Sequence, residues 1–165
     1  KDAIANVTLR PNLRQRQNLP AIAARGIEAN LGAEAGQFSL IASLAYTDAR
    51  IEGAGASLEL DGNRPPQVPR WSGSATLAWA PAAGWRLAAT LRHLAAQFED
   101  DLETDVLAPA TTLDAFAEVP LGRSGFAAVL QAENLTGETI VTRNAGGSID
   151  LGVPRTVWLG VRYGF

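Results

Sequence analysis

The sequence predicts an all-β fold: an antiparallel transmembrane β-barrel segment of about eight strands, with short turns at one end and long loops at the other. Three observations predict it. Apolar and polar residues alternate with a period of two, short and long connections alternate along the chain, and aromatic residues gather near strand ends. The 165-residue chain is 47% hydrophobic with a mean hydropathy of +0.01, yet no apolar run approaches the length of a membrane-spanning helix.

Each strand is predicted from its own alternation. A short strand at about 2–9 comes first, and a stretch at 18–33 has a competing helical pattern that Gly26, Gly32 and Pro20 disfavour. The remaining strands are predicted at 25–32, 37–48, 72–79, 85–92, 112–119, 125–134 and over the last eleven residues. In the last of these, Val157, Leu159 and Val161 share one face.

The connections between these strands differ in length in a regular way. Residues suited to tight turns lie at 34–37, 81–84 and 121–125, whereas longer polar segments lie at about 10–22, 51–71, 99–111 and 136–154. Because short and long connections alternate, all short turns must lie at one end of an antiparallel array. This asymmetry is typical of outer-membrane barrels, which have short periplasmic turns and long extracellular loops.

Aromatic residues predict two girdles. Those near a short turn or the C-terminus are Phe38, Trp79, Trp85, Phe126, Tyr163 and Phe165, and those next to long loops are Tyr46, Trp71 and Phe98. Small apolar residues separate the two sets, as between the aromatic girdles at the two membrane interfaces. The competing interpretation is a soluble β-sandwich binding module with aromatic residues closing the ends of its core.

The opposite face of the strands carries charges of both signs and is interpreted as the barrel lumen. It contains Glu28, Asn30, Arg86, Thr90, Arg92, Asp114, Glu118, Gln131, Glu133 and Arg162. Two roles are open for these side chains: cross-strand pairs that steady the wall, which we favour, or the lining of a substrate path. A charge on the lipid face would instead cost about 2–4 kcal/mol near the bilayer midplane.

Four segments, taken in order, resemble one family: the TonB-dependent outer-membrane receptors. They are 2–28, with its Arg16-Gln17-Asn18-Leu19 and Gly26-Ile27-Glu28; Pro66-Gln67-Val68-Pro69 leading into Trp71; Glu133-Asn134-Leu135-Thr136; and Gly152-Val153-Pro154-Arg155-Thr156, followed by Tyr163-Gly164-Phe165. The resemblance implies an active transporter for iron–siderophore, cobalamin or a similar scarce ligand, in the outer membrane of a Gram-negative bacterium.

The resemblance also implies that residues 1–165 are the C-terminal segment of a larger, 22-stranded barrel, without the plug domain. The absence of an initiating methionine is interpreted in the same way. The implied partners are the rest of the barrel and the plug, the TonB energy-coupling complex through an N-terminal part, and lipopolysaccharide with outer-membrane lipid. The alternative is a free-standing small eight-stranded barrel with a structural or adhesive role.

The terminal strand is predicted to be an assembly signal. Its alternation ends on Tyr163 and Phe165, and this ending resembles the segment that the barrel assembly machinery recognises. We therefore assign Tyr163 and Phe165 to assembly.

Other site chemistry is sparse. There is no cysteine and only one histidine, His93, which we place in the wall near the outer interface; neither an enzyme nor a resident cofactor or metal cluster is predicted. A net charge of −3 disfavours nucleic acid as a partner. Asp100, Asp101, Glu103 and Asp105 in one long loop are weak candidates for binding a cation or a cationic ligand, and a solvated acidic loop is the favoured interpretation.

Overall fold

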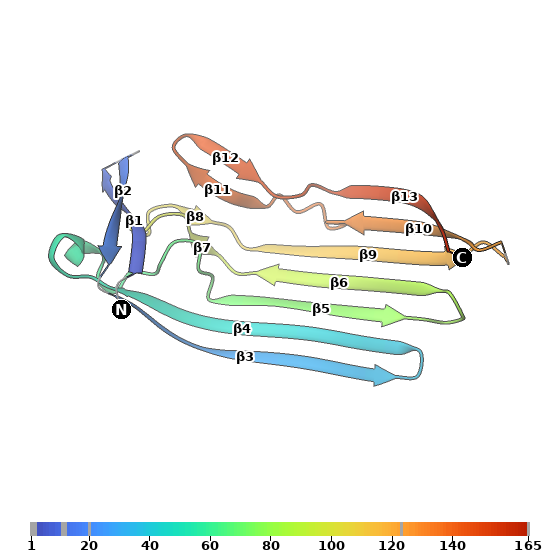
Figure 1. Cartoon of the computed structure of the whole chain (residues 1–165). Coiled ribbons are helices and arrows are strands. Elements are labelled where there is room, and N and C mark those ends of the chain that lie inside the picture. The colour runs from blue at the N-terminus through green and yellow to red at the C-terminus, as the bar shows by residue number, and fades with distance from the viewer. Residues whose placement is uncertain (1–2, 11–12, 20, 123, 165) are drawn as a thin grey trace.

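A computed structural model describes residues 3–10, 13–19, 21–122 and 124–164. Its main element is a seven-stranded antiparallel sheet in the order β13-β10-β9-β6-β5-β4-β3, in which each strand pairs with the next wall strand along the chain (Figure 1). The wall strands are β3 (Ala21–Ala35), β4 (Phe38–Glu52), β5 (Trp71–Trp79), β6 (Arg86–Leu94), β9 (Ala110–Pro120), β10 (Phe126–Glu133) and β13 (Thr156–Tyr163).

All seven wall strands predicted from period-two alternation are present, and β3 confirms a strand where a helical pattern competed. The predicted strand at about 2–9 forms as β1 (Ala3–Arg10), but its place in the wall is wrong. It pairs with β2 (Leu13–Leu19) in a separate two-stranded sheet, so most of the expected loop at 10–22 is strand. Because only two residues separate β1 from β2 in sequence, the two strands can pair with each other as a hairpin instead of with a wall strand.

The predicted alternation of connections is confirmed. Short turns join β3 to β4, β5 to β6 and β9 to β10, and they all lie at one end of the sheet (Figure 1). Gly36 and Gly84 have φ of 60° and 80° in two of these turns, a conformation that costs glycine little. The long connections lie at the other end and contain the hairpins β7 (Gln97–Phe98) with β8 (Val106–Leu107) and β11 (Val141–Ala145) with β12 (Ser148–Leu151).

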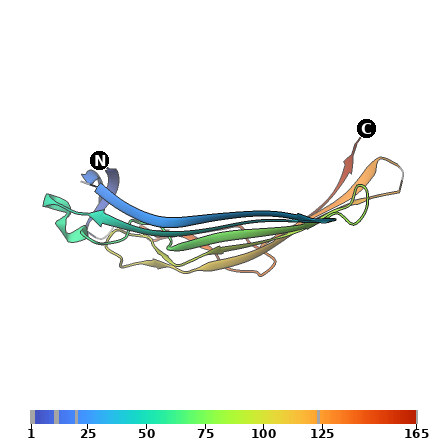
Figure 2. The same cartoon turned by 90° about the horizontal axis from the view of Figure 1, so that it is seen from below.

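The wall is a single curved layer rather than a sandwich (Figure 2). Its edge strands, β3 and β13, are not paired with each other, so the described strands form an open sheet instead of a closed eight-stranded barrel. No helix in the described ranges is long and apolar enough to cross a membrane. The one regular helical segment described is the 3-10 helix η1 (Gly55–Leu60).

Few apolar side chains are buried in this wall. Those that are fully enclosed, Ile51, Leu60 and Leu107, lie at the long-loop end, in the last part of β4, in η1, which contacts β4, and in β8. Leu159, in contrast, is 80% exposed in the middle of β13. The wall strands therefore leave large apolar side chains open for something outside the described sheet to cover.

Candidate functional site

One face of the wall is apolar from edge to edge. The register places together Ile27, Leu31, Leu40, Ala42, Leu44, Ala75, Leu77, Leu87, Leu91, Leu113, Ala117, Val119, Ala128, Leu130, Val157, Leu159 and Val161. His93 and Thr111 are its only polar members between the aromatic pairs described next, within the described strands, and His93 Nδ1 is hydrogen-bonded to Thr111 Oγ1 at 2.8 Å. We call this surface the apolar face.

Aromatic pairs bound the apolar face at both ends. Near the short turns, Phe38 stacks on Trp79 with ring centroids 5.7 Å apart, and Phe126 lies 4.7 Å from Tyr163. Near the long loops, Tyr46 lies 4.7 Å from Trp71. Eight residues separate Phe38 from Tyr46 on β4, which corresponds to about 26 Å of strand. Because the strands of such barrels are tilted by about 35–45°, this length of strand rises by about 20 Å, which is comparable with the apolar band, about 25 Å tall, of outer-membrane barrels.

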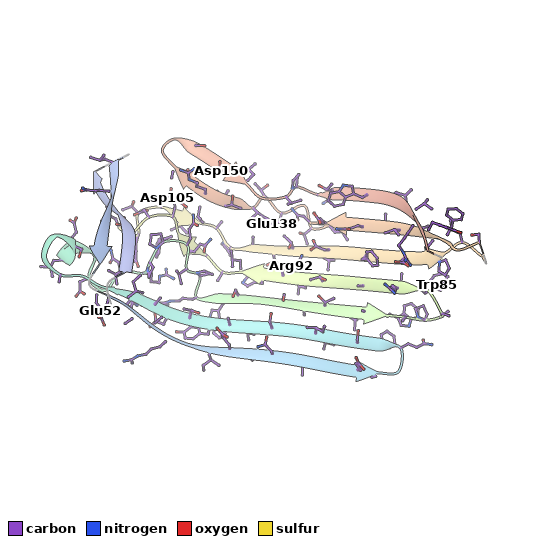
Figure 3. All side chains as sticks on the ribbon, viewed as in Figure 1. Glu52, Trp85, Arg92, Asp105, Glu138 and Asp150 are labelled. Carbon is purple, nitrogen blue, oxygen red and sulfur yellow. The ribbon has the colours of Figure 1, made fainter. Side chains whose placement is uncertain are left out.

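Phe98 and Trp85 refine the predicted girdles. Trp85 lies at the short-turn end of the sheet, as expected (Figure 3). Phe98 instead belongs to the loops: the Arg64 guanidinium lies 4.4 Å above its ring. A cation–π contact of this kind holds a loop side chain in place. Because Phe98 lies in β7, outside the wall strands, it is not part of the aromatic girdle next to the long loops.

The other face of the wall is polar, and its charges form pairs. Arg92 is paired with Asp114 on the neighbouring strand, and Arg162 of β13 is paired with Glu118 of β9 across the intervening strand β10. Hydroxyl pairs add to this set: Ser43 with Ser74 at 3.0 Å and Thr76 with Thr90 at 2.9 Å. These contacts support the interpretation that lumen charges steady the wall.

A shallow groove of about 510 Å³ lies on the polar face toward the long-loop end. Its lining includes Glu28, Asn30, Ser74, Arg92 and Thr112, with Ile140 from the last long connection above them. The groove presents hydrogen-bond donors and acceptors with both signs of charge. It is suited to polar contacts with a solute or another segment, and the described residues contain no group of side chains arranged to hold a metal ion.

The first two long connections form one ordered unit, which we call the loop layer (residues 53–70 and 95–109). Several bonds join them: Asn63 donates to the Asp101 carbonyl at 2.9 Å, the backbone N–H of Arg64 to Glu103 at 2.8 Å, and the Gln67 side chain to Glu99 at 2.8 Å. Leu60 and Leu107 in these connections, and Ile51 near the end of β4, are fully buried. The loop layer is therefore held together by its own side-chain and backbone contacts.

The acidic residues singled out in the sequence lie in this loop layer, but they are not a solvated cluster. Asp100 and Asp101 are 7% and 3% exposed, and the Asp100 carboxylate accepts hydrogen bonds from the backbone N–H groups of Leu102, Thr104 and Asp105 and from the Thr104 hydroxyl. Glu103 faces Arg64, with 3.8 Å between Oε1 and Nε. Ion binding by Asp100, Asp101, Glu103 and Asp105 stays a prediction; the contacts present hold the loop.

The ionisation of Asp100 follows from these contacts. Burial raises the pKa of Asp100, but the hydrogen bonds from Thr104, Asp105 and Leu102 outweigh it, and the pKa lies below its ordinary value. A carboxyl with a lowered pKa stabilises the folded loop above the unfolded pKa of about 3.9, and this contribution is lost as the pH falls through the folded pKa.

We therefore expect Asp100→Asn to loosen residues 99–107 by roughly 1–3 kcal/mol of local opening free energy, because the hydrogen bonds to a charged acceptor are weakened. Limited proteolysis across a pH series measures this. The wild-type loop should stay protected down to about pH 4 and open only in stronger acid. Asp105→Asn is the matched control, because Asp105 contributes its backbone groups to the loop. Equal loosening in both variants would contradict this role of the Asp100 side chain.

Asn134 fixes the base of the last long connection. It is 2% exposed and has a left-handed φ of 50°. Its side-chain amide donates to the carbonyls of Glu138 at 2.8 Å and Val153 at 3.0 Å, and its Oδ1 accepts from the Glu138 N–H and the Thr136 hydroxyl, both at 3.0 Å. Sequence reasoning noticed the segment at 133–136 without assigning this role to it.

Gly137 and Arg155 join the same base. A side chain at Gly137 would place its Cβ against the Arg155 guanidinium, and Gly137 has a φ of 69°. The motif residues Asn134 and Arg155 are thus joined through one loop base, although they are distant in sequence.

The two predicted assembly residues are placed differently. Tyr163 ends β13, is 55% exposed on the apolar face and contacts Phe126. Phe165 lies outside the described residues. The structure therefore places Tyr163 at the short-turn end of the wall, and the assembly role of both residues stays a prediction.

Comparison with known proteins supplies the context for these two faces. The model of the family "TonB dependent receptor-like, beta-barrel" matches residues 1–135. The search of curated proteins gave no match.

Solved structures similar to the chain cover most of it. It matches the siderophore receptor PiuA from Acinetobacter baumannii with a TM-score of 0.78 and 18% identity over 96% of this chain and 24% of that one. For the ferric preacinetobactin receptor BauA from the same organism, the TM-score is 0.77 and the identity is 21%, over 99% of this chain and 25% of that one. For the ferric yersiniabactin uptake receptor FyuA from Yersinia pestis, the TM-score is 0.78 and the identity is 18%, over 92% of this chain and 25% of that one.

These likenesses establish the fold of the described wall. The chain spans about a quarter of the length of each of these three structures. They are transport receptors and not enzymes, in agreement with the sequence prediction.

Proposed function

Because the chain belongs to the TonB-dependent receptor β-barrel family, we propose that it forms the C-terminal wall of an outer-membrane active transporter that takes up a scarce ligand with TonB-coupled energy. The ligand class proposed is an iron–siderophore complex, cobalamin or a similar chelate. The location proposed is the outer membrane of a Gram-negative bacterium, with the loop layer outside the cell and the short turns in the periplasm.

The observation that carries this proposal is the contrast between the two faces of the wall. The apolar face has no charged residue between its aromatic pairs in the described strands, and the span between Phe38 and Tyr46 is comparable with the height of the apolar band of outer-membrane barrels. The polar face carries ion pairs that water or protein can cover. A soluble sandwich would cover its apolar face with a second sheet, whereas the large described sheet is a single layer.

We further propose that residues 1–165 are the C-terminal segment of a larger barrel whose plug comes from another part of the protein. The open edges of β3 and β13 support this placement, because unpaired backbone groups cannot be left in lipid. The polar face supports contact with a plug, since Ile41 and Trp158 on it are 69% and 47% exposed. A free-standing eight-stranded barrel would need an eighth strand to join β3 to β13, which the seven-stranded described sheet does not have.

Uptake by the complete protein in which this chain occurs tests the function. Cells that depend on it should accumulate radiolabelled iron from one of a panel of citrate, catecholate or hydroxamate chelates, or labelled cobalamin. The uptake should stop when the TonB complex is inactivated. Uptake that continues without TonB, or no uptake of any probe by protein shown to be in the outer membrane, would contradict the proposal.

Assembly gives a second test, at the terminal strand. Deleting Phe165 from the complete protein should lower its amount in the outer membrane several-fold, because the terminal aromatic residue is proposed to be recognised during insertion; Tyr163→Ala should have a smaller effect in the same direction. Phe165→Tyr, which keeps an aromatic ring, is the control. Unchanged insertion of the deletion variant in a fractionation assay would disprove the role of Phe165.

A further inference from the structure

Two arginines lie on the apolar side of the wall, just beyond its aromatic pair Tyr46–Trp71, and the guanidinium of a third reaches the same place beside Asp48. Arg25 of β3 lies directly opposite Asp48 of β4 in the register, Arg50 follows two residues later on the same side of β4, and Arg70 immediately precedes β5. We call Arg25, Arg50 and Arg70 the interface arginines. Arg25 and Arg50 belong to neighbouring strands, and Arg70 lies just before the next strand, all at the long-loop end.

One carboxylate orients this group. Asp48 Oδ1 lies 3.2 Å from Arg50 Nε and 3.9 Å from Arg70 Nη2, and the backbone N–H of Thr47 donates to the Arg70 carbonyl at 2.9 Å. Arg50 also donates from Nη1 to the Gly62 carbonyl at 3.0 Å, which ties it to the loop layer. A single aspartate cannot neutralise three guanidinium groups, so the cluster keeps an excess of positive charge.

The cluster is open to its surroundings. The side chains of Asp48 and Arg50 are each 39% exposed and that of Arg70 is 46% exposed. Arg25 is also exposed. Glu52, the other charged residue on this side of β4, lies farther out, at the end of the strand (Figure 3). Apart from Asp48, which lies level with Arg25, the positive groups therefore lie closer to the aromatic pair than the next negative group, Glu52, does.

The depth of the cluster relative to the membrane follows from the register. Asp48 is two residues beyond Tyr46, which corresponds to about 7 Å of strand beyond the aromatic pair. Aromatic girdles lie at the headgroup level, where the hydrocarbon layer ends. The interface arginines thus lie where the charged groups of the outer leaflet begin, and the apolar face below them carries no charge among its described residues.

We propose that Arg25, Arg50 and Arg70 bind the phosphate groups of the lipopolysaccharide that surrounds the barrel. Guanidinium groups bind phosphate oxygens through paired N–H donors, and Asp48 keeps two of the three arginines in position for this. The inference rests on the proposed function in one respect: it requires the long-loop end of the wall to face the outer leaflet.

The test uses the complete protein purified from outer membranes, with Arg25→Gln and Arg70→Gln made singly and together. Arg50 is left in place because it also binds the loop layer. Lipopolysaccharide retained per protein is measured by mass spectrometry. Each single substitution should reduce the affinity for lipopolysaccharide roughly fivefold, and the double variant should lose about twentyfold or more. Each basic group contributes separately to binding an anionic surface. Arg86→Gln, on the polar face near the short turns, is the control and should retain wild-type lipid.

Two further arms identify the source of the phosphate. Lipopolysaccharide whose lipid phosphates have been removed should bind wild type and double variant equally, and inorganic phosphate alone should not protect the wild type against heat. Protection by inorganic phosphate, or equal retention of intact lipopolysaccharide by the double variant and the wild type, would overturn the inference. If the wild type fractionates outside the outer membrane, the proposed function fails as well, whereas equal retention by correctly located protein refutes only the lipid site.

Discussion

Leu91→Arg is expected to destabilise the barrel by about 2–4 kcal/mol, the largest effect among single changes on the apolar face. Leu91 is 48% exposed on β6, and its row in the register runs through Ala75 and Ala42. Ala42 is four residues from Phe38 and four from Tyr46, so this row lies midway between the aromatic pairs. An arginine there meets the centre of the hydrocarbon layer, where a charge is most costly.

The neighbouring position supplies a matched control. Thr90 points to the polar face, directly opposite Asp114, so Thr90→Arg gains an opposite charge while losing its hydrogen bond to Thr76. We expect it to change stability by no more than about 1 kcal/mol. Urea unfolding of the complete protein in lipid vesicles measures both variants. Equal destabilisation by the two arginines would mean that the two faces are not exposed to different environments.

Asn134→Ala is expected to lower stability by roughly 2–4 kcal/mol and to release the last long connection from the wall. The substitution removes four side-chain hydrogen bonds at a site that is 2% exposed, and it leaves the Glu138 N–H and the Val153 carbonyl without this partner. It also places alanine at a φ of 50°, which asparagine tolerates better. Protease cleavage within 137–153 and urea unfolding should both report the change.

Asn134→Gly separates the two causes. Glycine accepts the left-handed backbone without strain but lacks the side-chain bonds, so it should recover only about 1 kcal/mol relative to alanine. Full recovery with glycine would show that backbone conformation, and not the hydrogen bonds, is what the site requires. Stability of the alanine variant equal to that of the wild type would disprove the assigned role of Asn134.

The wall itself was predictable from sequence because the residue pattern that specifies each strand lies within that strand. A strand between lipid and lumen must alternate every second residue, and an antiparallel neighbour repeats the pattern, as in Leu91 and Leu113 on one face and Arg92 and Asp114 on the other. The aromatic pairs were predictable for the same reason, since Tyr46 and Trp71 flank a long connection.

The loop layer could not be predicted, because its contacts join segments far apart in sequence. Arg64 reaches Glu103 and Phe98, and Asp101 is buried against Asn63; nothing in the local pattern distinguishes these acids from solvated ones. The cluster of interface arginines could not be predicted from sequence for the same reason. Arg25 and Asp48 are opposite each other only once the register of β3 and β4 is known.

The pairing of β1 with β2 has a similar origin. Alternation predicts that a segment is a strand, but it does not say which neighbour that strand joins. A partner two residues away in sequence forms a hairpin with little loss of chain entropy, and this pairing replaces the expected place in the wall.

A labelling scan of β6 shows whether one face of the wall meets lipid while the other does not, and a chain without cysteine suits single-cysteine substitution. Spin labels placed singly at each of 87–92 in the complete protein, in its native membrane, report contact with lipid-soluble oxygen or with a water-soluble nickel chelate. Leu87, Ala89 and Leu91 should be accessible to oxygen, and Ala88, Thr90 and Arg92 should not. Uniform accessibility to the nickel chelate at all six positions would contradict it.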